Sequence, residues 1–209
     1  MQVGSPTERS RLRHNRCIQP LWISAAAHAV TATLLLAQLP AATAALPPSK
    51  PSEYDVKAAY ILNFGKFIRS SVHVAPRSSF EICTLGHDSM GSSLDALAAN
   101  SAIDRLPVHV THLTDITGAK SCQIVFISTT ESERLREDLA ILGNADVLTV
   151  SDAPDFLQRG GMIQFALVSN RVRFAVSLDA VNRTHLILSS ELLRVASSIS
   201  GKPPTGEMP

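Results

Sequence analysis

Residues 147–177 read VLTVSDAPDFLQRGGMIQFALVSNRVRFAVS, and this stretch decides the fold. Its apolar start at 147–150 has the length of a buried strand. The segment that follows, from Pro154 to Gly160-Gly161, predicts a short helix that ends with one glycine in the left-handed conformation. A strand that passes directly into a helix is the repeating unit of an α/β domain.

The second half of the stretch predicts a β-hairpin. Met162–Val168 and Arg171–Val176 alternate apolar and polar residues, as half-buried strands do. Ser169-Asn170 between them is a two-residue turn of the kind that joins antiparallel strands. Residues 189–198 then predict a helix that closes the domain.

Upstream of this stretch, strands and helices alternate. An amphipathic first helix begins after the capping residue Ser52 and ends near Arg69. The continuous apolar run at 124–127 is typical of a parallel strand that is covered on both faces. We therefore predict an α/β three-layer sandwich with a mixed, mainly parallel sheet and an antiparallel hairpin near the C-terminus. The further predicted elements are strands at 80–85 and 106–110 and helices at 92–99 and 131–142.

The N-terminal residues 1–44 predict a secretory signal peptide. Four arginines precede an apolar run from Leu21 to Leu39, and residues 42–44 (ATA) fit a small-x-small cleavage site. The alternative is a retained membrane anchor, because a run of about nineteen residues just reaches spanning length. The expected remainder of the chain is a linker at residues 45–52, a single domain at residues 53–199 and a flexible tail at residues 200–209.

The charge of the chain argues against a nucleic-acid partner. Removal of the signal peptide takes away four of the nineteen basic residues and one of the eighteen acidic ones, so the exported domain has a net charge of about −2. Binding to nucleic acid requires a clustered basic surface that neutralises phosphates. Export to the periplasm, where nucleic acid is scarce, excludes the same class of partner.

No pattern in the sequence points to catalysis, a cofactor or a metal. Residues 118–121 (GAKS) lack the spacing of a phosphate-binding loop, and no nucleophile elbow is present. His109 and His112 are three residues apart on a predicted strand, so their side chains point to opposite faces and make a poor metal pair. We therefore expect that the protein is not an enzyme and has no catalytic residue, cofactor or metal ligand.

A weak candidate for a small-ligand site is Gly86-His87-Asp88-Ser89, where a parallel strand passes into a helix. Open α/β sheets tend to bind ligands at that edge, and the start of a helix attracts anions. The simpler interpretation is a glycine turn with Asp88 or Ser89 as a helix cap.

Two cysteines, Cys83 and Cys122, remain after removal of the signal peptide. In an oxidising compartment an even pair predicts a disulfide, which here closes a loop of about forty residues. The alternative is two free buried thiols on neighbouring strands.

Five pieces of the sequence occur in the order that is characteristic of one family. They are Lys57-Ala58-Ala59-Tyr60 with Asn63-Phe64 and Lys66-Phe67, then Ile82–Gly86, Cys122–Ser128, Val147–Asp152 with Phe156 and Gly160–Phe165, and Arg171–Phe174 with Ser189–Leu193. In these pieces the chain resembles the YfiR family of periplasmic signalling proteins, over residues 53–199. Members of that family repress a membrane-bound diguanylate cyclase.

The resemblance implies an exported, non-catalytic regulator. Such a protein binds the periplasmic sensory part of an inner-membrane diguanylate cyclase and represses cyclic di-GMP synthesis, and an outer-membrane-associated protein acts as its release partner. The resemblance also implies a homodimer, and a disulfide between Cys83 and Cys122, since relatives commonly carry cysteines at these two places. A second cysteine pair of some relatives falls at Leu157 and Gln164, and it is absent here.

The matched hairpin and its surroundings supply the candidates for partner contact. For the apolar candidates the alternative is a place in the core. Many relatives carry an acid directly after the Arg-x-Arg-Phe motif and an asparagine two residues later, where this chain has Ala175 and Ser177. If the acid contributes to partner binding in relatives, this protein binds differently or chooses another partner. The candidate contact residues are Ile163, Phe165, Arg171, Arg173 and Val181.

A different functional class also fits an exported domain of this size. It is a periplasmic protein that binds a small molecule such as an amino acid and presents it to a receptor or transporter. A hydrolase is a more distant alternative. The regulator requires an affinity that differs between two states of the cyclase, whereas the binding protein requires that a ligand stabilises the fold.

Overall fold

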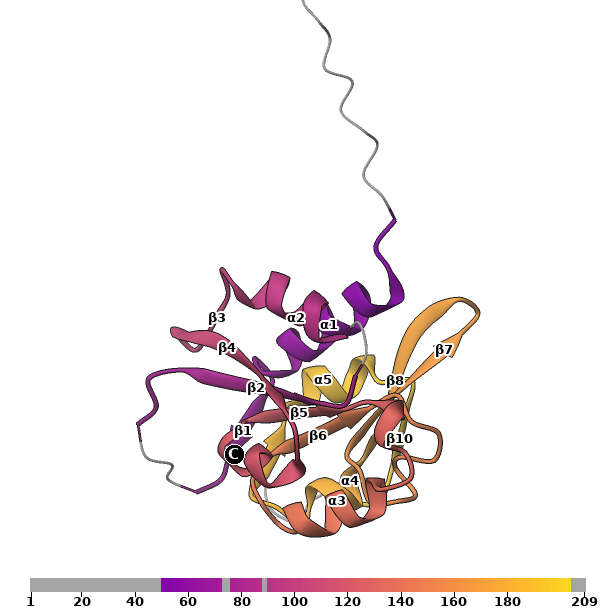
Figure 1. Cartoon of the computed structure of the whole chain (residues 1–209). Helices are drawn as coiled ribbons and strands as arrows, with labels where there is room; N and C mark the ends of the chain where they lie inside the picture. The colour runs from indigo at the N-terminus through magenta and orange to yellow at the C-terminus, as the bar shows by residue number, and fades with distance from the viewer. Residues whose placement is uncertain (1–49, 73–75, 88–89, 204–209) are drawn as a thin grey trace, which may run out of the picture. The chain divides into compact units, whose positions relative to one another are not determined.

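The computed structural model describes residues 50–72, 76–87 and 90–203 (Figure 1). The expected signal peptide, most of the expected linker and the end of the expected tail lie outside these residues. The strands are β1 (Ile68–Ser70), β2 (Phe80–Leu85), β3 (Ala102–Ile103), β4 (Leu106–Leu113), β5 (Ile124–Ile127), β6 (Leu148–Ser151), β7 (Ile163–Val168), β8 (Arg171–Ser177), β9 (Leu186–Leu188) and β10 (Ser198–Ser200). The helices are α1 (Glu53–Phe64), α2 (Met90–Ala98), α3 (Leu135–Leu142), α4 (Leu178–Val181) and α5 (Ser190–Val195), with the 3-10 helices η1 (Ile116–Ser121) and η2 (Thr129–Glu131).

Most of the strands form one mixed sheet in the order β10-β8-β7-β6-β5-β2-β4-β3. The four adjacent pairs between β7 and β4 (β7-β6, β6-β5, β5-β2 and β2-β4) are all parallel. β8 is antiparallel to β7, β3 is antiparallel to β4, and β10 is parallel to β8. β1 and β9 form a separate antiparallel pair. The predicted mixed, mainly parallel sheet with an antiparallel hairpin is therefore confirmed.

Helices cover both faces of this sheet (Figure 1). On one face, a buried cluster joins the sheet to α1, α2 and α5 through Ile61, Leu94 and Leu192. On the other face, a second cluster joins the sheet to α3 through Leu135 and to η1 through Ile116. The three-layer arrangement that the sequence predicts is confirmed.

The central strand β5 shows why the sheet needs both outer layers. Ile124 and Phe126 belong to the cluster on the α1 face, whereas Val125 and Ile127 belong to the cluster on the α3 face. All four side chains are fully buried. Successive side chains of a strand face opposite sides, so an uninterrupted apolar run is what a central parallel strand requires.

The first helix is shorter than the sequence predicts. It begins after Ser52, which caps it, and it ends at Phe64 rather than near Arg69. Beyond Gly65 the chain turns and forms β1, which pairs with β9. Ile68 continues the helical spacing of apolar residues but is buried in this strand, because pairing with β9 satisfies its backbone as well as a helix does.

Three other predicted helices differ in the structure. The helix predicted at 131–142 begins only at Leu135, after the separate 3-10 helix η2. Residues 154–160 form a series of turns, because Asp155 has a φ of 57° that interrupts helical geometry. Gly160, with a φ of 106°, has the predicted positive φ. The closing helix predicted at 189–198 stops at Val195, and the chain then pairs with β8 as β10. Within the part of the chain described here, no helix is long and apolar enough to cross a bilayer.

Candidate partner-binding hairpin

The β7–β8 hairpin extends beyond the strands that flank it (Figure 1). β7 pairs with β6 only at Ile163 and Gln164, and β8 pairs with β10 only over Ala175–Ser177. The two strands pair with each other as far as Val168 opposite Arg171. We call residues 165–173 the arm. Within the described chain, both edges of the arm are unpaired.

A tight turn closes the arm. Ser169 and Asn170 both have a positive φ, of 50° and 58°. This is the pattern of a type I′ turn, whose twist matches that of the flanking strands. The predicted two-residue turn is therefore confirmed. It fixes the register of the hairpin, so alternate side chains fall on an inner and an outer face.

The inner face of the hairpin packs against α1. Phe165 and Phe174 lie opposite each other and are both buried. The ring centroid of Phe174 lies 5.0 Å from that of Phe64 and 5.5 Å from that of Tyr60, in edge-on geometry. Such aromatic pairs contribute about 0.5–1.5 kcal/mol each beyond the area that they bury. Aromatic packing therefore holds the base of the arm on the helix.

Three of the proposed contact residues lie in this core. Ile163 and Phe165 are 0% and 2% exposed on the hairpin, and Val181 of α4 is 3% exposed. Their side chains bury apolar surface that the sheet and its helices cover, so they offer no accessible contact area. Of the two alternatives for these residues, the place in the core is the one that the structure shows.

The outer face of the arm carries the other two candidates. Arg171 and Arg173 are exposed, and they lie opposite Val168 and Ala166, which are exposed as well. In residues 50–72, 76–87 and 90–203, neither guanidinium has an ion-pair partner. Two unpaired cations, two residues apart on a regular strand, suit an acidic partner surface.

Sequence reasoning missed two apolar residues at the tip of the arm. Leu167 and Val168 are 53% and 52% exposed. The sequence does indicate this exposed apolar surface, because residues 166–168 are all apolar and interrupt the alternation of apolar and polar residues just before the turn. A two-stranded arm without a second layer cannot bury such a run on both faces. Grouped exposed apolar residues mark interaction surfaces.

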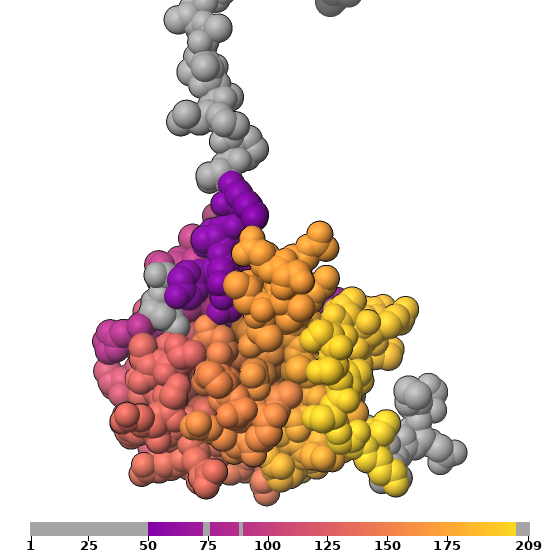
Figure 2. All heavy atoms as spheres, turned by 90° about the vertical axis from the view of Figure 1, so that its right-hand side faces the viewer, coloured from indigo at the N-terminus to yellow at the C-terminus, as the bar shows by residue number. Residues whose placement is uncertain are grey.

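A groove separates the arm from the start of α1. Its volume is about 470 Å³, and it is lined by Val56 and Tyr60 of α1 and by Leu167 and Arg173 of the arm, with Glu53 at the start of the helix. Figure 2 faces this side of the molecule and shows the start of α1, in indigo, beside the hairpin, in orange. The groove combines an apolar lining with charges of both signs, as protein interfaces do.

A buried lysine fixes α1 to the sheet. Lys57 is 5% exposed, and its Nζ lies 2.7 Å from Asp152 and 2.6 Å from Glu53. Burial opposes its charge, but hydrogen bonds to the two carboxylates and their negative charges outweigh burial and raise its pKa. Sequence reasoning missed this pair. The available signal is that Lys57 shares the buried stripe of the helix with Ile61 and Phe64.

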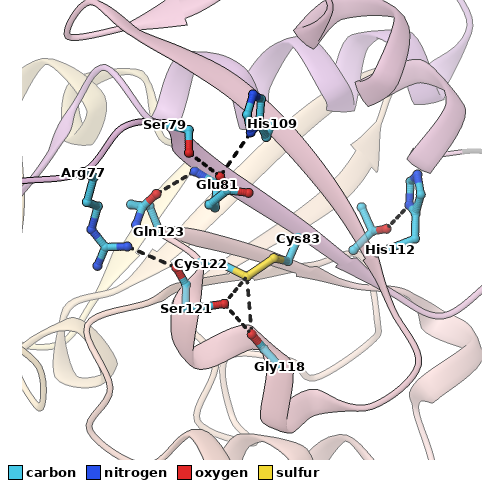
Figure 3. Close-up of a disulfide and its surroundings, with 11 residues drawn as sticks. Arg77, Ser79, Glu81, Cys83, His109, His112, Gly118, Ser121, Cys122 and Gln123 are labelled. Atoms are coloured by element: carbon cyan, nitrogen blue, oxygen red, sulfur yellow. Dashed lines mark hydrogen bonds and ion pairs between the residues drawn. A yellow bond between two sulfur atoms is a disulfide. The ribbon is translucent and has the colours of Figure 1, made fainter.

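A disulfide joins Cys83 of β2 to Cys122, which follows η1 (Figure 3). The two residues are 39 positions apart in sequence, and both are buried in the cluster on the α3 face. Beside them, Arg77 donates a hydrogen bond of 3.1 Å to the carbonyl oxygen of Ser121. The expected disulfide is therefore present in the structure, in place of two free thiols.

Thr130 packs against the first two residues of the weak ligand-site candidate. Gly86 has a φ of 99° and follows β2, at the carboxyl edge of the sheet next to β5. A Cβ at Gly86 would lie 2.5 Å from the Thr130 Oγ1, and the His87 amide donates a hydrogen bond of 3.2 Å to the same oxygen. Asp88 and Ser89 lie outside the described residues. These contacts fit the glycine-turn interpretation.

The two histidines of β4 interact with different acids. His109 Nδ1 lies 3.4 Å from Glu81, whereas His112 Nε2 lies 3.1 Å from Asp95 of α2. They do not converge on one point. Within the described residues, no group of three or more acidic, histidine or cysteine side chains is arranged to hold a metal ion.

Comparison with known families identifies the class of protein. The model of the YfiR/HmsC-like family matches residues 54–197, which is most of the chain. The chain belongs to the YfiR/HmsC-like family. Proteins of this family are periplasmic, non-catalytic regulators that act on diguanylate cyclase signalling. The matched range contains the hairpin, the disulfide and all of α1 except Glu53, and the resemblance inferred from the sequence is confirmed.

A crystal structure resembles this YfiR/HmsC-like chain in fold. It is a conserved domain protein from Vibrio cholerae O1 biovar eltor strain N16961, with a TM-score of 0.50 and 9% sequence identity. The similarity covers 73% of this chain and 62% of that chain, so this chain spans less than two thirds of that protein. An identity this low shows the fold alone. No curated protein matches the sequence.

Proposed function

We propose that this protein is an exported regulator that binds the periplasmic sensory part of an inner-membrane diguanylate cyclase and represses cyclic di-GMP synthesis. Family membership supports this class of partner. In the proposal residues 1–44 are the signal peptide, and the domain acts in the periplasm as a homodimer that an outer-membrane-associated protein releases from the cyclase. Repression requires only that the protein binds the inactive state of the cyclase more tightly than the active state.

The observation that carries the proposal is the composition of the arm. Leu167 and Val168 offer apolar contact area, and Arg171 and Arg173 offer two cations without an ion-pair partner in the described chain. Protein interfaces combine an apolar centre with a charged rim, and arginine is enriched in them. Because aromatic packing orders the base of the arm before a partner arrives, binding loses less conformational entropy.

The departure from relatives at Ser177 leaves the surface unchanged. Its Oγ accepts a hydrogen bond of 3.3 Å from the Ala180 amide and so caps α4. Serine and asparagine are equally good at this position of a helix. The serine therefore performs the structural task that an asparagine would perform, and its side chain is buried.

The departure at Ala175 changes the outer face of the hairpin. Ala175 lies opposite Gln164 and next to Ser198 of β10, at the base of the arm. It shares the outer face with Arg173, two residues away. An acid at this position would partly neutralise that arginine. Without the acid, the face is more positive, and we infer that the cognate sensor presents a more acidic contact surface than the sensors of relatives.

The test of the docking surface is the double charge reversal Arg171→Glu with Arg173→Glu. Both side chains are exposed, so the fold is expected to be unchanged. The affinity for the purified sensory part of the cyclase, measured by calorimetry, is expected to fall by about tenfold or more. The control Lys120→Glu with Lys202→Glu changes the net charge equally at exposed positions outside the arm. Unchanged affinity of the arm variant would remove the arm from the docking surface.

Repression itself is tested in cells. Deletion of the gene is expected to raise cyclic di-GMP. Complementation with the parent gene is expected to lower cyclic di-GMP to the level of the parent strain, whereas complementation with the arm variant is expected to leave it raised. The variant must be exported at the level of the parent, as judged by periplasmic fractionation. If deletion leaves cyclic di-GMP unchanged under conditions in which the protein is exported, repression is not its function.

A further inference from the structure

A second hollow lies away from the arm, between α3, the loop that precedes β7 and the segment that follows α4. Its volume is about 320 Å³. One face of α3 forms a wall through Arg136, Leu139 and Ala140, which are three and four residues apart and therefore neighbours on the helix. Val147, just before β6, and Met162, just before β7, lie behind this wall and are almost fully buried. This is enough room for a small molecule, at the lower end of the range of ligand pockets.

The charge of the hollow has one sign. Arg136, Arg159 and Arg183 line it, and none of the residues that line it is an aspartate or a glutamate. In the part of the chain that the structure describes, none of these three arginines has a carboxylate within ion-pair distance. The three come from α3, the loop before β7 and the segment after α4, so only the fold brings them together.

Two of the arginines are held in place by backbone carbonyls. Arg159 Nη1 donates a hydrogen bond of 2.8 Å to the carbonyl oxygen of Ser132. Arg183 donates from Nη2 to Gly160, at 3.0 Å, and from Nη1 to Asp179, at 3.3 Å. A guanidinium has five N–H donors, so each keeps donors that these bonds do not use. The carbonyls orient the side chains without neutralising their charge.

We infer that this hollow binds a small anionic ligand through an oxyanion, either a carboxylate or a phosphate. The planar fork of a guanidinium matches both groups with paired hydrogen bonds, and such charge-assisted bonds are stronger than neutral ones. The partly exposed side chain of Leu139 then contacts an apolar part of the ligand. This site goes beyond the proposed function, because it needs neither the arm nor the cyclase.

The test uses the protein purified from the periplasm and two probes, sodium succinate and inorganic phosphate. Each is titrated at constant ionic strength against sodium chloride, with neutral succinamide as a further control. The readouts are the melting temperature and the amide NMR shifts of Gly143, Asn144 and Gly160, which line the hollow. At least one anion is expected to give saturable shifts with a Kd of about 1 mM or tighter and to raise the melting temperature. Succinamide is expected to give neither effect.

Variants separate this site from general salt effects. Arg136→Gln removes a cation without an ion-pair partner in the described chain, and Arg136→Gln with Arg183→Gln removes two. The double variant is expected to weaken binding by about tenfold or more, and the single variant by less. The control Lys120→Gln with Lys202→Gln is expected to bind as the parent does. The single variant keeps the test valid if the double variant does not fold.

The outcomes decide both the site and its ligand class. Saturation by phosphate but not succinate assigns a phosphate ligand, and the reverse assigns a carboxylate. If neither anion saturates, or if saturable binding is unchanged by Arg136→Gln in a folded protein, the inference is overturned. Cyclase binding enters none of these measurements, so failure of this site leaves the proposed function untouched, and the converse holds as well.

Discussion

The two faces of the sheet are stabilised by different means. The cluster on the α1 face is the larger one, and it contains five buried phenylalanines among mostly aliphatic side chains. The cluster on the α3 face has one fully buried phenylalanine, Phe156, and it contains the disulfide between Cys83 and Cys122. The buried phenylalanines of the α1 face are Phe64, Phe80, Phe126, Phe165 and Phe174.

This difference follows from the helices that cover each face. The α1 face is covered by α1, α2 and α5, whereas the α3 face is covered by α3 and the short 3-10 helix η1. A smaller layer buries less apolar surface, and a covalent link offsets part of that deficit by restricting the unfolded chain. We therefore expect packing changes to be most costly on the α1 face and the disulfide to matter most on the α3 face.

The largest effect is expected for Phe174→Ala. Phe174 is 1% exposed and contacts both Tyr60 and Phe64, so truncation leaves a cavity between the hairpin and α1. The free energy of unfolding is expected to fall by about 3–5 kcal/mol, as for other buried phenylalanines. Urea denaturation of the oxidised protein measures it. Phe174→Leu is the matched control and is expected to cost less. A loss below about 1 kcal/mol would show that the hairpin is not packed on α1.

A somewhat smaller loss is expected when the disulfide is removed by Cys83→Ala with Cys122→Ala. A closed loop with a sequence separation of 39 corresponds to about 4 kcal/mol at most in the loop-entropy model. Reductant is expected to destabilise the parent by a similar amount and to leave the double variant unchanged. If reductant leaves the parent as stable as before, the disulfide does not stabilise the α3 face.

The two changes also test whether the faces are independent. Phe174 and Cys83 lie on opposite faces, and several strands separate β8 from β2 in the sheet. Effects of distant changes add to within about 0.5 kcal/mol. The combined variant is therefore expected to lose the sum of the two separate losses, unless it is too unstable to fold. A clear excess over the sum would show that the two layers stabilise each other through the sheet.

Six of the eight strands of the sheet were predictable because their signals are local, whereas β3 and β10 were not predicted. The apolar run of β5, the alternation of β7 and β8 and the Ser169-Asn170 turn each depend on neighbouring residues. The limits of helices were less predictable. Where β1 and β10 form, residues far away in sequence supply the pairing strand, and this overrides the helical spacing.

The functional surface was predictable only in part, for the same reason. The alternation placed Arg171 and Arg173 on the solvated face, but it could not decide whether Ile163 and Phe165 face a helix or a partner. The answer depends on α1, about a hundred residues earlier in the sequence. The three arginines of the second hollow have no shared local pattern, so only the folded chain shows that they meet.

The smallest effect, and one of opposite sign, is expected for Asp138→Asn on α3. Asp138 is 1% exposed, and its carboxylate has no hydrogen-bond partner in the described chain, although Arg134 Nη2 lies 3.9 Å away. Burial raises its pKa above the ordinary value of 3.8, and the charge of Arg134 opposes this. Glu131 and Glu137 raise it further. The folded protein therefore binds this proton more tightly than the unfolded chain does.

The sign of the pH dependence follows from that order of pKa values. At a pH below the pKa of Asp138 in the unfolded chain, this carboxyl is protonated in both states and does not weaken the fold. As the pH rises through the raised pKa of the folded protein, its ionisation lowers the free energy of unfolding. Asp138→Asn is therefore expected to be more stable than the parent at neutral pH, by roughly 1 kcal/mol or less, because Arg134 already offsets part of the charge. Its advantage is expected to disappear in acid, as measured by urea denaturation across the pH range.

Asp115→Asn is the control with the opposite sign. A hydrogen bond from the Thr117 hydroxyl lowers the pKa of Asp115, so loss of the Asp115 carboxylate is expected to destabilise the fold at neutral pH. An advantage of Asp138→Asn that persists unchanged in acid would show that charge burial is not its cause.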